Sequence, residues 1–195
     1  MRQIWVIADT HFNHGSIIDF ERKQFTSVEE HNQTIIDNYN KVVGDEDIVY
    51  FLGDIGFTGY KYNLKDLAKL ISKMKGHKIL IMGNHDKFLV GEAKGVLGFE
   101  EVHVGPYYYS DHIILSHEPV REALDNPYVV NVHGHLHNAN LNLPNFFNVN
   151  VAQRNYFPTN MALFKREEHK CKTRRETFKQ EWYAPYYNFF NKEEK

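Results

Sequence analysis

Near its start the chain reads Ile4-Trp5-Val6-Ile7-Ala8-Asp9-Thr10-His11, an apolar run that leads directly into an acidic residue and a histidine. The apolar part has the length of a buried β-strand. Four further apolar runs end in the same way, within residues 48–54, 79–86, 113–117 and 129–137. A buried strand explains each run by itself, but it does not explain why five of them end in Asp, Asn or His. We therefore expect the strand ends to meet at one rim and to hold metal ions together.

The polar residues that follow these runs are aspartate, asparagine and histidine. The individual residues are Asp9, His11, Asp54, Asn84, His85, Asp86, His117, His135 and His137. Carboxylates suit hard cations such as Mn²⁺ and Mg²⁺, whereas imidazole suits Zn²⁺, Fe and Ni²⁺. The mixture therefore indicates Mn, Fe, Zn or Ni and excludes a site for calcium alone. A spacing of two residues, as in Asp9 and His11, places both side chains on one face of an extended backbone.

Composition narrows the function classes. A chain of 195 residues is expected to form one domain with a sizeable core. The net charge of −2 gives no global basic field, so no strong nucleic-acid patch is expected. Cys171 is the only cysteine, which excludes an intramolecular disulfide and a Cys-x-x-Cys metal knuckle. The sequence shows neither a signal-peptide pattern nor a membrane-spanning apolar run, which predicts a cytoplasmic protein without membrane contact.

Periodicity predicts helices between the first strands and more strands in the second half. Ser27 begins one helix with a capping box, and Asn63 begins another that Gly76 is expected to cap. Further along, the pattern predicts a hairpin in 102–116, strands at 128–132, 146–151 and 160–164, and a helix at 177–191. Helices beside mixed β-structure predict one layered α/β domain over residues 1–195, with 166–195 as a helical extension.

The order and spacing of five motifs resemble those of the calcineurin-like metallophosphoesterases. The motifs are Asp9-x-His11, Gly53-Asp54, Gly83-Asn84-His85-Asp86, His117 and Gly134-His135-x-His137. The flanking residues 9–14 and 148–151 look like a compact bacterial and phage branch of that family. The resemblance implies a four-layer αββα sandwich, with two mixed β-sheets flanked by helices. It also implies a hydrolase that uses two divalent cations, with Mn²⁺ as the cation expected to support activity in vitro.

The same resemblance implies a role for each motif residue. The two metal sets would be Asp9, His11 and His137 for one cation and Asn84, His117 and His135 for the other, with Asp54 bridging. A hydroxide bridging the cations would attack phosphorus in line. His85 would then protonate the departing alkoxide, and Asp86 would orient the His85 imidazole. His14 and His133, which lie beside the motifs, are expected to have structural or pocket-lining roles.

The substrate is less constrained than the metal site. In the protein serine/threonine phosphatases of this superfamily a phosphate-gripping arginine follows the Gly-Asp motif, and here Ile55-Gly56-Phe57-Thr58-Gly59 stands in its place. Arg22, Arg121 or Arg154 could contact phosphate from elsewhere. We expect a small phosphate-ester or nucleotide substrate, most simply a phosphodiester. The alternatives are a phosphomonoesterase, a nucleotide pyrophosphatase, a nuclease acting on single-stranded ends, and a non-catalytic metal-binding scaffold.

Aromatic residues are frequent in the last part of the chain. They include Trp182, Tyr183, Tyr186, Tyr187, Phe189 and Phe190. A solvated tail does not need so many apolar rings. We therefore expect this segment either to dock on the core or to form the contact of a homodimer.

Overall fold

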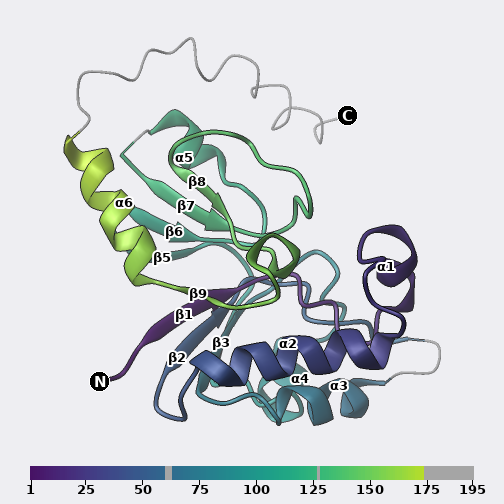
Figure 1. Cartoon of the computed structure of the whole chain (residues 1–195). Helices are drawn as coiled ribbons and strands as arrows, with labels where there is room; N and C mark the ends of the chain where they lie inside the picture. The colour runs from purple at the N-terminus through teal and green to yellow at the C-terminus, as the bar shows by residue number, and fades with distance from the viewer. Residues whose placement is uncertain (60–62, 127, 174–195) are drawn as a thin grey trace.

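The structure, a computed structural model, describes residues 1–59, 63–126 and 128–173, in which two β-sheets lie between helices (Figure 1). The first sheet contains, in spatial order, β4 (Glu101–His103), β3 (His77–Ile81), β2 (Ile48–Phe51), β1 (Ile4–Ile7) and β9 (Thr159–Asn160). The second contains β5 (Tyr107–Ser110), β6 (Ile113–Leu115), β7 (Val130–His133) and β8 (Phe146–Asn148).

Parallel pairing brings the ends of the ligand-bearing strands to the same edge of each sheet. Strands β1 to β4 are parallel, and only β9 runs against its neighbour β1. In the second sheet β6, β7 and β8 are parallel, and β5 pairs with β6 as an antiparallel hairpin. The register aligns Ile7 of β1 with Phe51 of β2, and Phe51 with Leu80 of β3. The segments that follow these strands therefore begin side by side.

Helices cover the outer faces of the two sheets. The helices are α1 (Gly15–Phe20), α2 (Val28–Val42), α3 (Leu64–Ile71), α4 (Val90–Gly95), α5 (Arg121–Asp125) and α6 (Ala162–Thr173). Residues of α2, α3 and α4 pack on the first sheet, and residues of α5 pack on the second. Helix α6 contacts β6 and β7. The expected αββα sandwich with two mixed sheets is confirmed.

The alternation of side chains between the two faces of each strand explains why the sheets pack into apolar layers. Ile7 of β1 faces the helices, whereas Val6 and Ala8 face the second sheet. Neighbouring side chains of a strand point to opposite faces of the sheet, so a wholly apolar strand can be buried on both faces. The core between the sheets also includes Leu115 and Val132 from the second sheet. The rim that carries the polar motifs thus stands on three packed apolar layers.

Both predicted helix starts are confirmed. The Ser27 side chain accepts the N–H of Glu30 at the start of α2, and the Asn63 side chain accepts the N–H groups of Lys65 and Asp66 at the start of α3. The expected cap at Gly76 is wrong, because α3 ends at Ile71. Gly76, with φ of +80°, instead turns the chain into β3.

The predicted hairpin in 102–116 is confirmed as β5 and β6, but two later strands are shorter than expected. The strand expected at 146–151 stops at Asn148 and is followed by a 3₁₀ turn, Val151–Arg154. The strand expected at 160–164 stops at Asn160, because the Asn160 side chain accepts the N–H of Ala162 at 2.9 Å and α6 begins there. The helix expected at 177–191 and the aromatic cluster 182–190 lie outside the described residues.

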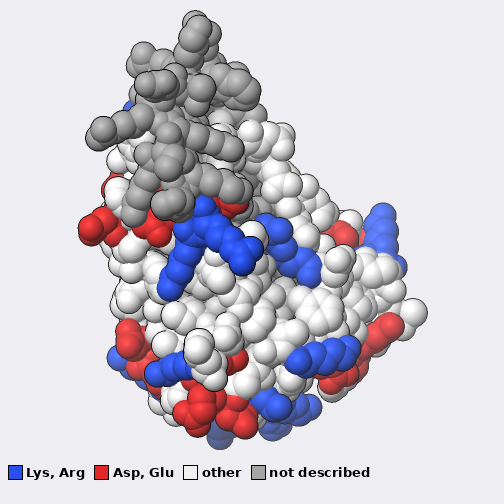
Figure 2. Space-filling model, turned by 60° about the vertical axis from the view of Figure 1, so that its left-hand side comes forward, with Lys and Arg blue, Asp and Glu red and all other residues white. Residues whose placement is uncertain are grey.

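Charges of both signs are mixed over the molecular surface that Figure 2 presents. Lys and Arg side chains form a short row across that face, and Asp and Glu side chains lie near it. The row does not extend into an unbroken basic stripe on this face, which agrees with the net charge of −2. Among the helices of the described residues, none is long and apolar enough to cross a membrane.

Candidate metal centre

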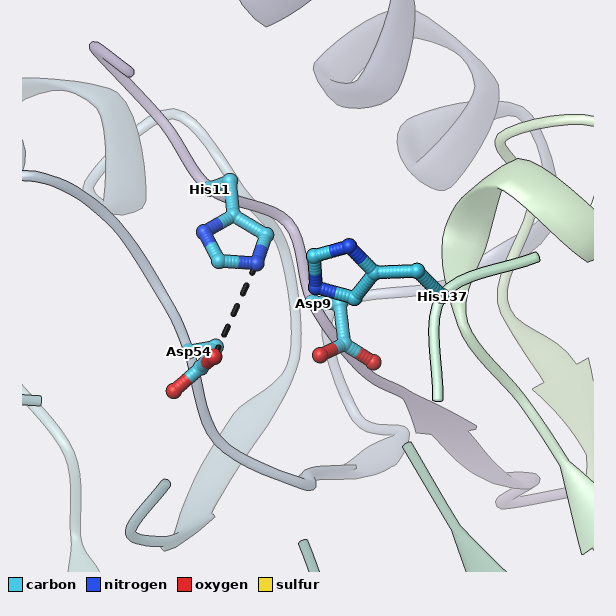
Figure 3. A group of neighbouring side chains, drawn as sticks. All are labelled: Asp9, His11, Asp54 and His137. Atoms are coloured by element: carbon cyan, nitrogen blue, oxygen red, sulfur yellow. Dashed lines mark ion pairs between the residues drawn. The ribbon is translucent and has the colours of Figure 1, made fainter. Parts of the chain in front are cut away.

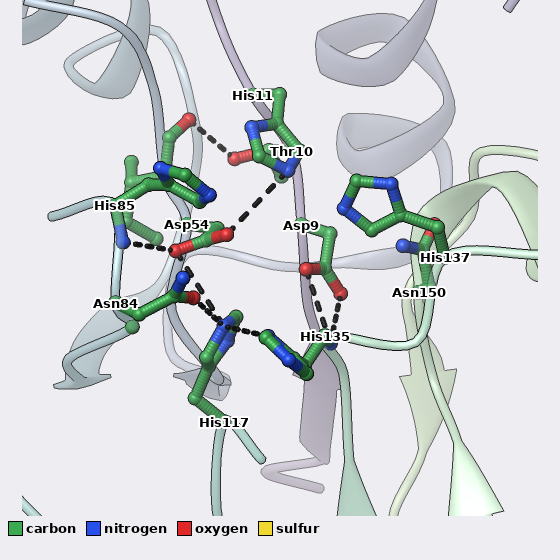
Figure 4. Close-up of polar contacts among 12 residues, drawn as sticks. Asp9, Thr10, His11, Asp54, Asn84, His85, His117, His135, His137 and Asn150 are labelled. Carbon is green, nitrogen blue, oxygen red and sulfur yellow. Dashed lines mark hydrogen bonds and ion pairs between the residues drawn. The ribbon is translucent and has the colours of Figure 1, made fainter. Parts of the chain in front are cut away.

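The seven predicted metal ligands come from the carboxyl ends of five strands, and the structure brings them together. Asp9 and His11 follow β1, Asp54 follows β2 and Asn84 follows β3. From the second sheet, His117 follows β6, whereas His135 and His137 follow β7. Figure 4 shows these side chains converging from both sheets on one space. The rim inferred from the sequence is therefore present.

One half of this space is formed by Asp9, His11, Asp54 and His137. Each of the four offers a ligand atom, and these atoms all lie within 4.8 Å of one another. Figure 3 shows the four side chains pointing toward a common centre. The Nε2 atom of His11 is 3.6 Å from an Asp54 carboxylate oxygen and, although buried, has no hydrogen-bond partner among the described residues. A nitrogen left unpaired beside two carboxylates fits a cation that all four side chains share.

The other half is formed around the Nε2 atom of His117. This nitrogen lies 2.8 Å from Oδ1 of Asn84, 3.2 Å from Nδ1 of His135 and 3.5 Å from Oδ1 of Asp54 (Figure 4). The four side chains again present one oxygen or nitrogen each toward a shared point. Asp54 is the member common to both halves, with one carboxylate oxygen near His11 and the other near His117. The donor set thus fits two adjacent cations with Asp54 between them.

Five of the seven candidate ligands have a left-handed backbone. Their φ angles are +57° for Asp9, +45° for His11, +53° for Asp54, +64° for His135 and +45° for His137. Positive φ is uncommon outside glycine, although Asp and His tolerate it better than β-branched residues do. Such residues typically cost about 1–3 kcal/mol each and persist where the surrounding fold imposes them. The rim is therefore a set of strained turns held by the sheets beneath.

Two glycines allow the carboxylates to reach their places. A Cβ atom at Gly134 would stand closer than 3.0 Å to the Asp9 carboxylate, and one at Gly83 would stand equally close to the Asp54 carboxylate. Backbone rather than side chain therefore faces each acid. At Gly134 the next residue also contributes, because the His135 N–H donates to both Asp9 oxygens at 3.1 Å. This explains why glycine stands directly before the candidate ligands Asn84 and His135.

Partners outside the centre fix the direction of two imidazoles. The Nδ1–H of His117 donates to the carbonyl of Leu52 at 2.9 Å, which leaves Nε2 free to face the centre. The Nδ1–H of His137 donates to the Glu21 carboxylate at 2.5 Å, with the same consequence for its Nε2. Such outer partners set the tautomer and raise the basicity of a metal-binding histidine. Sequence analysis missed Glu21, which lies 116 residues from His137 and outside every motif.

Burial disfavours the charged form of the acid and of the imidazoles in this space. It raises the pKa of the Asp9 carboxyl well above its usual range, and the neighbouring Asp54 carboxylate raises it further. It lowers the pKa of the His11 and His117 imidazoles, so both rings are neutral and can act as ligands. An ionised Asp9 is therefore unfavourable in this space without a positive charge nearby, and a divalent cation would supply that charge.

His85 and Asp86 lie at the centre, but they do not contact each other as expected. The His85 ring is exposed, with its centroid 6.2 Å from that of His11. The buried Asp86 carboxylate accepts the backbone N–H groups of Asp54 at 3.0 Å, Ile55 at 2.9 Å and Gly83 at 2.8 Å. Among the described residues, no hydrogen bond joins Asp86 to the His85 ring. Asp86 therefore positions the loop of Asp54, which corrects the role inferred from the motif.

Arg22 lies beneath the Asp9 loop rather than in the space where a phosphate would bind. Arg22 is 1% exposed, and its guanidinium donates to the carbonyls of Asp9 at 2.6 Å and Thr10 at 3.2 Å. The same guanidinium lies 2.6 Å from Nε2 of His31. Arg154 donates to the carbonyl of Asn148, and Arg121 pairs with Asp125. The expectation that Arg22 could contact phosphate is therefore wrong, and Arg22 instead supports the loop that carries Asp9 and Thr10.

We expect Arg22→Met to lower the free energy of unfolding by about 3 kcal/mol, because it leaves several buried acceptors without a donor. The freed Asp9 loop should also bind cations more weakly. Urea unfolding measures the first effect and calorimetric titration with Mn²⁺ the second. Arg2→Met, at an exposed position, is the control. An Arg22→Met protein with both properties of the parent would contradict the supporting role.

The two histidines expected to line or support the pocket differ in their surroundings. His14 is partly buried at the rim, where its ring stacks on Phe57 with centroids 5.3 Å apart and lies 5.4 Å from the His11 ring. His133 is 1% exposed, and its Nδ1 lies 2.9 Å from the carbonyl of Gly134. His14 therefore borders the centre, whereas His133 belongs to the packed strand.

Comparison with known proteins agrees with this geometry. The model of a family described as calcineurin-like phosphoesterase matches residues 2–194. An uncharacterized protein of Methanocaldococcus jannaschii is 38% identical over 175 residues, which cover 84% of this chain and 89% of that protein. The Gene 66 protein of Mycobacterium phage L5 is 37% identical over 86 residues, or 44% of this chain and 41% of that protein. The crystal structure of a protein of unknown function from Aquifex aeolicus is 26% identical, with a TM-score of 0.69, and the match covers 85% of this chain and 99% of that one.

Proposed function

The chain belongs to the calcineurin-like phosphoesterase family, and on that premise we propose that this metal-dependent phosphoric ester hydrolase cleaves phosphodiesters at two divalent cations. One cation would be held by Asp9, His11, Asp54 and His137, the other by Asp54 and the side chains of Asn84, His117 and His135. The convergence of these seven side chains on one space, with Asp54 shared, is the observation that carries the proposal.

In the proposed reaction, the cations and the side chains of the protein would have different roles. When bound, two divalent cations would supply Lewis acidity toward the phosphoryl oxygens and a water-derived nucleophile of lowered pKa. His85 would donate a proton to the oxygen of the departing group, since its exposed ring stands beside the His11 half of the centre. Asp86 would hold the Asp54 loop in place through its three backbone hydrogen bonds. Water would thus replace the leaving alcohol on phosphorus.

The arrangement of the arginines favours diesters over monoesters. A monoester carries two negative charges on its phosphoryl group at neutral pH, and a diester carries one. Arg22 and Arg154 are committed to main-chain carbonyls, so neither can supply the additional cation that a dianion would need. Mn²⁺ is the cation we propose for activity in vitro, since two carboxylates and an amide among the seven side chains offer the oxygen ligands that suit it.

We expect the Mn²⁺-loaded protein to hydrolyse an aryl phosphodiester faster than the matching aryl phosphomonoester. The measurement compares kcat/KM for bis(p-nitrophenyl) phosphate and p-nitrophenyl phosphate on one preparation, before and after chelation of the metal. Faster monoester cleavage would contradict the preference for diesters while leaving a phosphoesterase. Bound metal without turnover of either ester would favour a non-catalytic scaffold.

A further inference from the structure

A groove of about 550 Å³ opens beside the Asn84 half of the centre. Three segments line it, namely residues 81–84 and 86–87 at the end of β3, residues 104–106 between β4 and β5, and residues 116–120 after β6. Asn84 and His117, two candidate ligands, belong to these walls, whereas His85 does not. Sites for small molecules usually have volumes of about 300–1,000 Å³, so the groove has the size of a ligand site.

Buried polar side chains hold two walls of the groove in place. The amide of Asn131, which is 0% exposed, donates to the Ser116 hydroxyl at 2.9 Å and accepts the N–H of Val120 at 2.9 Å. The Ser116 hydroxyl in turn donates to the carbonyl of Glu118 at 2.6 Å. On the opposite wall, Asp86 accepts the N–H of Gly83. The groove is therefore preformed, which reduces the ordering cost of binding.

The lining combines apolar surface with one lysine and two acids, Asp86 and Glu118, and the Asp86 carboxylate is occupied by backbone N–H groups. Val104, Pro106, Pro119 and Val120 contribute apolar area, and Lys87 is the one lysine or arginine of the lining. Lys87 is exposed, and no ion pair joins it to a carboxylate within the part of the chain that the structure describes. An apolar wall with one cation suits a ring system that is attached to a singly charged phosphate.

We propose that this groove binds the organic group that remains on phosphorus after cleavage, and that this group has the size and chemistry of a nucleoside. The inference rests on the proposed phosphodiesterase activity. The bond from phosphorus to the leaving oxygen breaks and that oxygen takes the proton of His85. The oxygen of water bonds to phosphorus and gives up one proton to the solvent, from which His85 is protonated again. Because His85 lies outside the groove, the leaving group departs elsewhere and the groove keeps the retained group.

Lys87 would contact a non-bridging oxygen of the phosphodiester at the mouth of the groove. A single lysine is enough for a small ester with one phosphate. A long single strand of nucleic acid would instead require a series of cations along the groove. The charge of the lining thus favours a mononucleotide ester over a polynucleotide.

The test compares two esters that share the p-nitrophenolate leaving group, so that only the retained group differs. They are thymidine 5′-(p-nitrophenyl phosphate) and methyl p-nitrophenyl phosphate. Val104 is 74% exposed, so Val104→Trp fills the groove without disturbing the core. We expect it to lower kcat/KM for the thymidine ester about tenfold more than for the methyl ester. Val42→Trp, at an exposed valine that ends α2, should give no such difference.

Lys87→Ala should raise KM for both esters about tenfold, because the phosphate is common to them. Lys94→Ala, at an exposed lysine on α4 outside the groove, is its control. Calorimetric titration with thymidine 5′-monophosphate provides a readout without turnover, and Val104→Trp should weaken that binding as well.

The possible results distinguish a wrong assignment of the groove from a wrong assignment of the reaction. Equal effects of Val104→Trp on both esters, with unchanged binding of thymidine 5′-monophosphate, would overturn the groove assignment and leave the activity standing. Absence of turnover of either ester by the parent protein would overturn the proposed function, and the assignment with it. If an oligothymidylate binds much more tightly than thymidine 5′-monophosphate, and salt weakens that binding, the occupant of the groove is a nucleic-acid strand and not a single nucleoside.

Discussion

Asp54→Asn should reduce phosphoester hydrolysis by about 10³-fold or more and lower the amount of bound metal. Loss of an outer partner of a metal ligand typically costs 10–100-fold, and Asp54 is proposed as a direct ligand of both cations. The substitution removes one negative charge from a buried space where only Asp9 would remain to compensate the cations. Rate measurements with Mn²⁺ and elemental analysis of the dialysed protein measure the two effects.

The asparagine variant should keep its fold. Oδ1 of Asp54 accepts the N–H of His85 at 2.9 Å, and an amide oxygen can accept the same bond. Asp111→Asn, in the exposed turn between β5 and β6, removes the same charge outside the centre and should leave rate and metal content unchanged. Full activity of Asp54→Asn, with two cations bound, would disprove the assignment of the centre.

His85→Ala should lower the rate by about 10²–10⁴-fold while the metal content stays at the level of the parent. The reason is that His85 would lie beside the reacting group without holding a cation. The loss should also depend on the leaving group. An ester that releases an alcohol needs a proton far more than one that releases p-nitrophenolate, which is stable as an anion. The measurement is therefore kcat for an alkyl ester and for an aryl ester, with parent and variant.

His77→Ala provides the control, because His77 is a partly exposed histidine at the start of β3 whose partner is Glu100. The same loss for both esters would mean that His85 stabilises charge on the phosphoryl oxygens instead of donating a proton. Loss of metal from His85→Ala would show that His85 is a ligand, and the donor role would then be wrong.

The strands and the candidate ligands could be predicted because both depend on local sequence. A buried parallel strand needs a continuous apolar run, and its end can be recognised by the polar residue that follows, as at Asp9 and Asp54. The glycines of the motifs are visible in the sequence as well, but the acids for which Gly83 and Gly134 make room follow other strands. The parallel order of the strands then brings the separate motifs to one place.

The supporting residues could not be predicted, because their partners are distant in sequence. Arg22 has the charge expected of a phosphate-binding residue, and only its burial beneath Asp9 and Thr10 shows another role. Asp86 follows His85 directly, yet its carboxylate turns back to backbone N–H groups of two other loops. Near the end of β9, the apolar pattern fitted a longer strand, and the side-chain hydrogen bond of Asn160 started a helix instead.

The left-handed backbone of five candidate ligands means that a substitution there can stabilise the fold and at the same time weaken the proposed activity. Glycine would adopt these φ angles at little cost, so replacing any of the five would relieve strain while it removes a side chain that we propose as a metal ligand. A sequence selected for heat resistance alone would therefore drift toward glycine at the rim and become inert. Strain retained at five proposed ligands is what a site selected for its chemistry, and not for stability alone, would show.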